Sequence, residues 1–260
     1  MSLQRMSPRV LPADGQRAPV YPNGRNPRAL AWLVTAVALL PAFLAVADGR
    51  GGFRLVMGAL AVTILTIGIS LHRMFGAIEP RVVRVDEDAA GLRFAPPAAA
   101  TLPMFAVAVA LLLPGIAQLV VDTQGLPTMS GGIVSRAPYA LGILGLVTLA
   151  VQLWRVRVPA GLELTTERLR GIRGSAGVDW RWEDLADVSV AAGPVAKLSL
   201  VPRGGAGRPV LAPMLALGSD PNEVAAIVRF YLERPAERVA LAEGGVAAVR
   251  RVEDALRARR

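Results

Sequence analysis

The chain has 260 residues, of which 53% are hydrophobic and only 19% are charged. A soluble domain averages about 25% charged residues, so this composition disfavours a wholly soluble globular protein. The chain has no cysteine and one histidine. This composition excludes disulfides, thiolate metal sites, cysteine nucleophiles and any relay of several histidines.

The formal net charge is +9, and Lys197 is the only lysine among 29 basic residues. A basic balance is typical either of nucleic-acid binding or of a membrane protein that faces anionic lipid. The sequence has no interleaved aromatic and basic residues and no recognition-helix pattern. We therefore expect no nucleic-acid partner and interpret the arginines as signals of membrane orientation.

Residues 1–28 contain five prolines among glycine, arginine and serine. No apolar periodicity survives this composition, so we predict a disordered basic N-terminal tail. The tail is not a signal peptide, because the apolar stretch after it is too long and a second one follows at once.

Four apolar runs follow, at about 29–47, 54–72, 100–121 and 137–154. Each approaches the roughly 20 residues that cross a bilayer as a helix. None contains an internal Asp, Glu, Lys or Arg, each of which costs about 3 kcal/mol at the bilayer centre. We predict four spans in two transmembrane hairpins, 29–72 and 100–154, with the tight link 48–53 inside the first hairpin.

The arginines favour one side of these spans. They lie before the first span, in the segment 73–97 and directly after the fourth span, whereas the opposite side has only Arg50, Arg54 and Arg136. The positive-inside rule then predicts that both termini lie in the cytoplasm. Trp32 and Trp154 lie near the inner span ends, where aromatic belts occur.

Two polar segments have the pattern of β-structure. Residues 80–97 predict a cytoplasmic β-hairpin that either completes the C-terminal sheet or packs on it. Residues 157–213 contain six short strand candidates separated by glycine and proline, which predicts an antiparallel sheet or half-barrel. These candidates are LELT, RLRGIRG, GVDWRW, LADVSVA, AKLSLVP and RPVLAP.

Helices are expected after these strands. Asp220 is placed to cap a helix, Pro221 fits its first position, and Glu223 completes a capping pattern. The helix should end at Pro235. The last segment, 236–260, predicts a basic C-terminal helix that is bent or broken at Gly244–Gly245.

Residues 157–235 resemble the pleckstrin-homology-like (PH-like) domains of bacterial, actinobacterial-type membrane proteins. The likeness lies in the stretches GLELTTERLRGIRG, VDWRWEDLADVSV and SDPNEVAAIVRFYLERP. It implies a binding or assembly module and no reaction, and it does not imply phosphoinositide binding. The expected fold class is membrane α-helical, with four spans in two hairpins, plus a cytoplasmic PH-like antiparallel β-domain with a closing helix. The resemblance implies a location in the bacterial plasma (inner) membrane.

Several polar and aromatic residues have both a functional and a structural interpretation. The acids 86–88 favour a solvated turn over a metal site, because adjacent residues point different ways. His72 favours a membrane-interface position over a pH sensor or ligand. Trp180 and Trp182 favour core packing over an aromatic binding surface. The segment 203–208 (RGGAGR) favours a hairpin turn over a phosphate loop.

Residues inside the spans have two interpretations. The prolines and glycines favour close helix packing over the broken helices of a transporter. These residues are Pro41, Pro103, Pro114, Gly58, Gly68, Gly115, Gly142 and Gly145. Gln118, Gln152 and the span threonines are suited to hydrogen bonds between helices. No ionisable residue lies within the predicted spans, which disfavours a proton or ion path.

No acid–base pair or nucleophile–base pair is visible, so we expect no enzyme, no catalytic residue, no cofactor and no metal. The leading hypothesis is a non-enzymatic membrane adaptor or accessory subunit whose partners are the lipid bilayer and another membrane or cytoplasmic protein. The alternative is a small oligomeric transporter or channel subunit for a hydrophobic or lipid substrate, and a homo-oligomer is left open. The expected anionic-lipid or partner surface consists of Arg155, Arg157, Arg203, Arg208, Arg250 and Arg251.

Overall fold

The structure is a computed structural model of the chain. It describes residues 2–8, 17–20, 27–77, 79–128, 133–173, 177–191, 193, 195–204 and 207–258. The chain divides into two compact units. The helical unit comprises Asn26–Gly76 and Thr101–Trp154, and the β-unit comprises Met1–Arg25, Ala77–Ala100 and Arg155–Arg260.

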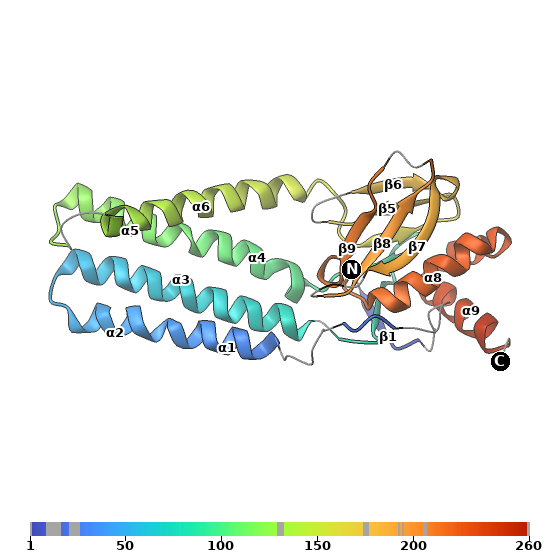
Figure 1. Ribbon diagram of the computed structural model, residues 1–260, viewed down its shortest axis with the longest axis horizontal. Coiled ribbons are helices and arrows are strands. Elements are labelled where there is room, and N and C mark those ends of the chain that lie inside the picture. Colours follow the sequence, from blue (N-terminus) through green and yellow to red (C-terminus); the bar gives the residue numbers. More distant parts are fainter. Residues whose placement is uncertain are drawn as a thin grey trace. The chain divides into compact units, whose positions relative to one another are not determined.

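The helical unit contains two helical hairpins (Figure 1). The first consists of α1 (Pro27–Val37), α2 (Leu39–Ala47) and α3 (Gly51–Gly76). The second consists of α4 (Ala98–Ala110), α5 (Leu112–Gln124) and α6 (Ile133–Arg155).

Four stretches of these helices are long and apolar enough to cross a membrane: Arg28–Ala47, Gly51–Gly76, Ala98–Gln124 and Ser135–Arg155. The prediction of four apolar helices is therefore confirmed, with ends that extend beyond the predicted ones. Many of their large apolar side chains point outward; Phe43 is 69% and Val46 is 81% exposed. Such a surface suggests membrane association, because lipid is the medium that removes it from water.

The extended third helix also corrects one expectation. Asp122 belongs to α5, inside the stretch Ala98–Gln124. An ionisable residue therefore does lie within one of the four apolar helices, close to its C-terminal end. The sequence interpretation missed it because the apolar run ends at Val121, whereas the helix continues for three more residues.

Two prolines explain why each hairpin contains a divided helix. A single residue separates α1 from α2 and α4 from α5, and each lies three positions before a proline, Pro41 or Pro114. Proline has no N–H for the carbonyl four residues earlier. For Pro114 that carbonyl belongs to Ala110, and the buried hydroxyl of Thr63 on α3 donates to it at 2.7 Å. A neighbouring helix thus satisfies the carbonyl.

The span glycines mostly allow close packing. A Cβ added to Gly115 would lie 3.0 Å from the Cα of Gly142, and one on Gly145 would lie 2.9 Å from the Cβ of Leu111. The packing interpretation is confirmed at these positions. It is not confirmed at Gly58, where nothing in the described structure lies within 4 Å of an added Cβ.

His72 has an ordinary packing role in the structure. Its ring lies 5.5 Å, centroid to centroid, from that of Trp32, in a tilted arrangement. Both residues belong to the helical unit, where α1 packs against α3. This ring contact gives His72 a structural role, and its expected position at the membrane interface stays a prediction.

The β-unit contains an antiparallel six-stranded sheet in the order β1-β2-β3-β4-β5-β6. The strands are β1 (Leu3–Met6), β2 (Val83–Asp86), β3 (Leu92–Phe94), β4 (Leu162–Leu164), β5 (Arg168–Gly171) and β6 (Val178–Arg181). The predicted hairpin 80–97 is confirmed, and it completes the sheet, because β3 pairs with β4.

The N-terminal tail corrects the prediction of disorder for residues 1–28. Leu3–Met6 pairs with Val83–Asp86, and residues 17–20 contact the β-unit through Ala18. Part of the predicted tail, including residues 9–16 and 21–26, lies outside the described residues. A four-residue strand beside several prolines carries little periodic signal, so its partner β2 determines its structure.

A second sheet has the order β7-β8-β9, and helices follow it. The short helix η2 (Trp182–Asp184) precedes its strands, which are β7 (Leu185–Ala191), β8 (Lys197–Pro202) and β9 (Val210–Pro213). The helices after it are α7 (Met214–Leu217), α8 (Pro221–Glu233), η3 (Pro235–Glu243) and α9 (Gly245–Arg257). All six strands expected between 157 and 213 are present, but they are divided between two sheets. The predicted break at Gly244–Gly245 separates η3 from α9.

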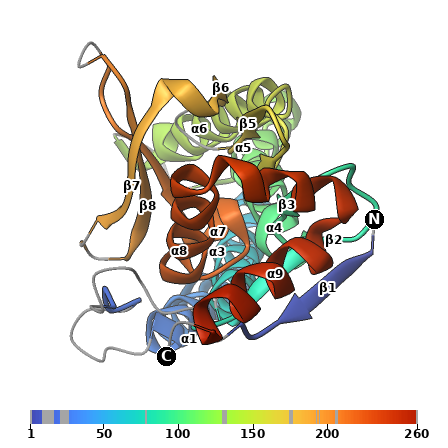
Figure 2. The same ribbon diagram turned by 90° about the vertical axis from the view of Figure 1, so that its right-hand side faces the viewer.

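Both sheets share one hydrophobic core. Helix α8 packs on β7 and β8, whereas α9 packs on β2 and β3 (Figure 2). A Cβ on Gly245 would collide with the side chain of Val85, so glycine lets α9 approach β2 closely. The hydroxyl of Tyr231 on α8 donates to the carbonyl of Ala248 on α9 at 2.9 Å and joins the two helices.

The two tryptophans belong to the core. Trp182 is 1% exposed, and its indole Nε1 donates to the Thr165 carbonyl at 2.9 Å. The guanidinium of Arg238 lies over its ring, with Cζ 4.7 Å from the ring centroid. Trp180 is partly buried and packs against the same core. The core interpretation is therefore confirmed for this pair.

Candidate functional site

The N-terminus of α8 is the best-defined polar site of the β-unit. Asp220 caps the helix by accepting from the backbone amide of Asn222 at 2.9 Å. Its other carboxylate oxygen accepts from the amide of Arg81 at 2.7 Å, and its own amide donates to Val82. The cap therefore also holds the segment before β2 against α8.

A short piece of the N-terminal tail, residues 17–20, docks on this helix end. The side-chain amide of Asn222 accepts from the Ala18 amide at 2.9 Å and donates to the Ala18 carbonyl at 3.1 Å. The Arg17 guanidinium donates to Glu223 Oε1 at 2.5 Å, and Val20 is buried. We call Asn222, Glu223 and the segment they hold the α8 dock.

Glu223 is fully buried at this dock. Burial raises the pKa of its carboxyl to about 7, while the nearby charge of Arg17 lowers it, Asp220 raises it and Arg81 lowers it. Its Oε2 atom has no hydrogen-bond partner in the described structure. A buried carboxylate with one unsatisfied oxygen is costly, so Arg17 offsets only part of the cost.

The dock corrects the predicted role of Glu223. A capping box would have its carboxylate accept from the Asp220 amide, but that amide donates to Val82. The Asp220 cap and Pro221 at the first turn are confirmed. The sequence interpretation missed the pairing of Glu223 with Arg17, because the two residues are 206 positions apart.

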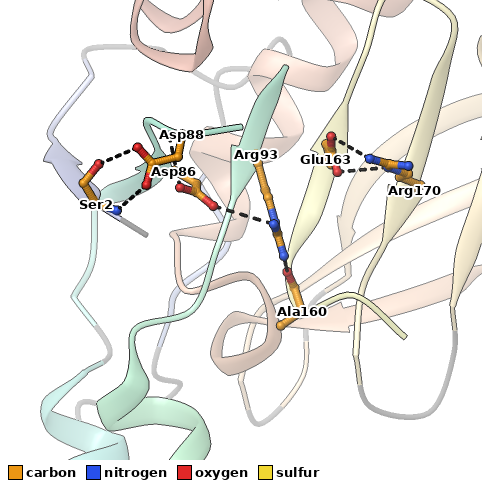
Figure 3. Close-up of polar contacts among 7 residues, drawn as sticks. All are labelled: Ser2, Asp86, Asp88, Arg93, Ala160, Glu163 and Arg170. Carbon is orange, nitrogen blue, oxygen red and sulfur yellow. Dashed lines mark hydrogen bonds and ion pairs between the residues drawn. The ribbon is translucent and has the colours of Figure 1, made fainter. Parts of the chain in front are cut away.

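The acids of the β2–β3 turn hold the start of the chain (Figure 3). The Ser2 amide donates to Asp88 at 3.0 Å, and the Ser2 hydroxyl donates to Glu87 at 3.2 Å. The bond from the Ser2 amide lowers the pKa of Asp88. The expected solvated turn is confirmed for Glu87 and Asp88, which are exposed, whereas Asp86 is buried. The turn also anchors β1 beside β2.

A row of alternating charges crosses the six-stranded sheet from Asp86 to Asp179. The register of the strands places Arg93 opposite Glu163, Glu163 opposite Arg170, and Arg170 opposite Asp179. Figure 3 shows Asp86, Arg93, Glu163 and Arg170 in this order. Arg93 lies 3.6 Å from Asp86, and Arg170 contacts both oxygens of Glu163 at 3.0 and 3.1 Å. Opposite charges on adjacent strands favour this register over a slipped one.

The six arginines of the expected surface do not form one patch. Arg155 ends α6 and Arg157 follows it, Arg203 and Arg208 flank the β8–β9 turn, and Arg250 and Arg251 lie on α9. The β8–β9 turn and α9 lie apart in both views of the β-unit (Figures 1 and 2). Arg251 also pairs with Glu237 at 2.8 Å. The structure therefore separates the positions on the β8–β9 turn from those on α9.

Comparison with known proteins found no matching family model, no matching curated protein and no matching solved structure.

Proposed function

We propose that this chain is a non-enzymatic integral protein of the bacterial plasma membrane whose cytoplasmic PH-like β-unit acts as a binding or assembly module. In this role it is a membrane adaptor or accessory subunit. The α8 dock is the observation that carries the proposal, because it holds a peptide segment through hydrogen bonds to its backbone and one partly buried ion pair.

The composition of the β-unit supports the topology. Its three pieces precede the first apolar helix, connect the two hairpins and follow the fourth apolar helix. Pieces that fold together must lie on one side of a membrane, and two hairpins return the chain to that side. The excess of arginine in these pieces favours the cytoplasmic side.

The order of elements supports a PH-like assignment. Six antiparallel strands, β4 to β9, precede a capped amphipathic helix that packs on β7 and β8. Strands β1 to β3 then extend the sheet at the β4 edge. Under this assignment the N-terminal half of the chain adds strands to a module encoded mainly by the C-terminal half.

The dock is suited to partners as well as to the tail. The hydrogen bonds that Asn222 makes with Ala18 go to its backbone amide and carbonyl, a mode that accepts different side chains at that position. Glu223 adds a preference for an arginine one residue earlier. An arginine-containing extended segment of a membrane or cytoplasmic protein fits these contacts.

In-cell photo-crosslinking of the full-length protein tests the proposal. A photoreactive amino acid at Arg203 or Arg250, both exposed on the β-unit, is expected to capture the same partner protein reproducibly from at least one position. The exposed Gly49, in the link between α2 and α3, provides a matched control that should not capture it. Mass spectrometry identifies the crosslinked species.

Self-crosslinks alone from both β-unit positions would contradict the adaptor proposal. They would favour the alternative of a small oligomeric transporter or channel subunit for a hydrophobic or lipid substrate. One observation supports that alternative: Gln118 and Tyr139 both donate to Asp122, at 2.8 and 2.5 Å, and form a polar cluster at one end of the second hairpin.

A further inference from the structure

An apolar groove of about 270 Å³ lies between α5 and α6 in the helical unit. On α5 it is lined by Leu112, Ile116 and Leu119, and on α6 by Ile143 and Leu146, with glycines at the close approach of the two helices. Ile116 is 55% and Ile143 is 64% exposed. These side chains line an open apolar groove on the surface of the second hairpin.

One end of the groove is polar and charged. Tyr139 lines the groove, and its hydroxyl donates to Asp122, which follows the lining residue Leu119 by one helical turn. Arg136 precedes Tyr139 by one turn and is exposed. Residues three apart share a helix face, and α5 and α6 run antiparallel. A carboxylate and a guanidinium therefore lie at the same end of the two groove walls.

Asp122 retains capacity to bind a ligand. It is exposed, and each of its oxygens accepts one hydrogen bond, from Gln118 or from Tyr139. A carboxylate offers about four lone-pair sites, so both oxygens have room for a further donor. A charged side chain within an apolar membrane helix is a functional feature by default.

We propose that this groove binds a zwitterionic phospholipid whose head group carries a primary ammonium, as in phosphatidylethanolamine. An acyl chain lies along the apolar walls, the ammonium donates to Asp122, and the phosphate pairs with Arg136. Charge complementarity selects this occupant: a negative and a positive side chain end the groove, as a negative and a positive group form the head of such a lipid. The inference rests on the membrane placement proposed above and is independent of the adaptor role.

Lipid retention tests the site with the full-length protein. The protein is reconstituted in nanodiscs of equal parts dioleoyl phosphatidylethanolamine, phosphatidylcholine and phosphatidylglycerol, extracted in mild detergent and analysed by native mass spectrometry. We expect phosphatidylethanolamine to be retained about fivefold over phosphatidylcholine. The quaternary ammonium of phosphatidylcholine has no N–H to donate to Asp122, and phosphatidylglycerol has no ammonium.

Three variants separate the parts of the site, and two further variants serve as controls. Asp122→Asn should remove the preference for phosphatidylethanolamine, with Asp48→Asn, in the α2–α3 link, as the charge control. Arg136→Gln should weaken retention of all three phospholipids. Ile143→Trp should fill the groove and abolish retention, whereas Val147→Trp, at another exposed α6 position outside the groove lining, should not.

If the wild type and Asp122→Asn retain phosphatidylethanolamine over phosphatidylcholine with the same preference, the proposal is overturned. Lipid retention by Ile143→Trp that matches Val147→Trp would also overturn it, as would masses showing that Ile143→Trp dissociates a dimer, which would assign the groove to a second copy of the chain. The two proposals fail in different experiments. If no partner protein is crosslinked, the adaptor proposal fails, but the lipid retention measured here is unaffected.

Discussion

Replacing Trp182 with alanine is expected to lower the free energy of unfolding of the β-unit by about 3–5 kcal/mol. The indole is among the largest fully buried side chains, and its removal leaves a cavity between the two sheets and η3. The change also leaves the Thr165 carbonyl without its donor and Arg238 without the ring beneath it. Thermal unfolding of the full-length protein in detergent measures the loss.

Trp180→Ala is the matched control for this prediction. Trp180 lies two residues earlier and is only partly buried, so its loss should cost about 1–2 kcal/mol. If the two variants lose equal stability, the assignment of Trp182 as the central side chain of the core is wrong.

Glu223→Gln is expected to abolish a pH dependence of stability and to stabilise the β-unit at pH 8. Burial raises the pKa of Glu223 from 4.5 to about 7, and a difference of that size corresponds to about 3 kcal/mol. This pKa already includes the ion pair with Arg17, and glutamine resembles the protonated carboxyl, so the net gain at pH 8 should also be about 3 kcal/mol.

The direction of the pH effect follows from proton binding. Between pH 4.5 and about 7 the folded protein holds a proton on Glu223 that the unfolded chain has released. The stabilisation is therefore complete below pH 4.5 and is lost as the pH rises to about 7. Stability of the wild type should fall across this window, and that of Glu223→Gln should stay nearly flat.

Glu237→Gln serves as the control for the pH series. Its hydrogen bond with Arg251 lowers the pKa of Glu237, so its contribution has the opposite sign and lies at lower pH. Denaturant unfolding at several pH values compares the three proteins. A wild type whose stability does not fall between pH 4.5 and 7 would show that Glu223 is not held as a buried carboxyl.

Local patterns in the sequence predicted most individual elements. The four apolar helices were recognisable because charges are absent over about 20 residues each, and the six strands because glycine and proline separate short apolar runs. The capped helix α8 followed from Asp220 and Pro221. These features depend on neighbouring residues, so a single sequence carries them.

Such local patterns could not predict which distant segments of the chain pair with one another. Strand β1 pairs with β2 some 80 positions later, β3 pairs with β4 about 70 positions later, and Arg17 meets Glu223 across 206 positions. Counting arginines likewise predicted a basic surface but not its division between the β8–β9 turn and α9. The α8 dock is a product of such contacts between distant segments. The groove beside Asp122 depends on how two consecutive helices pack, which the apolar pattern of each helix does not show.

Cysteine accessibility tests the central claim of one cytoplasmic β-unit most directly, because the chain has no cysteine of its own. Gly49→Cys lies in the α2–α3 link, where no atom lies within 4 Å of an added Cβ, and Arg203→Cys lies exposed on the β-unit. A membrane-impermeant maleimide should label Gly49→Cys in intact spheroplasts and Arg203→Cys only after permeabilisation. Labelling of Arg203→Cys in intact spheroplasts would contradict the account.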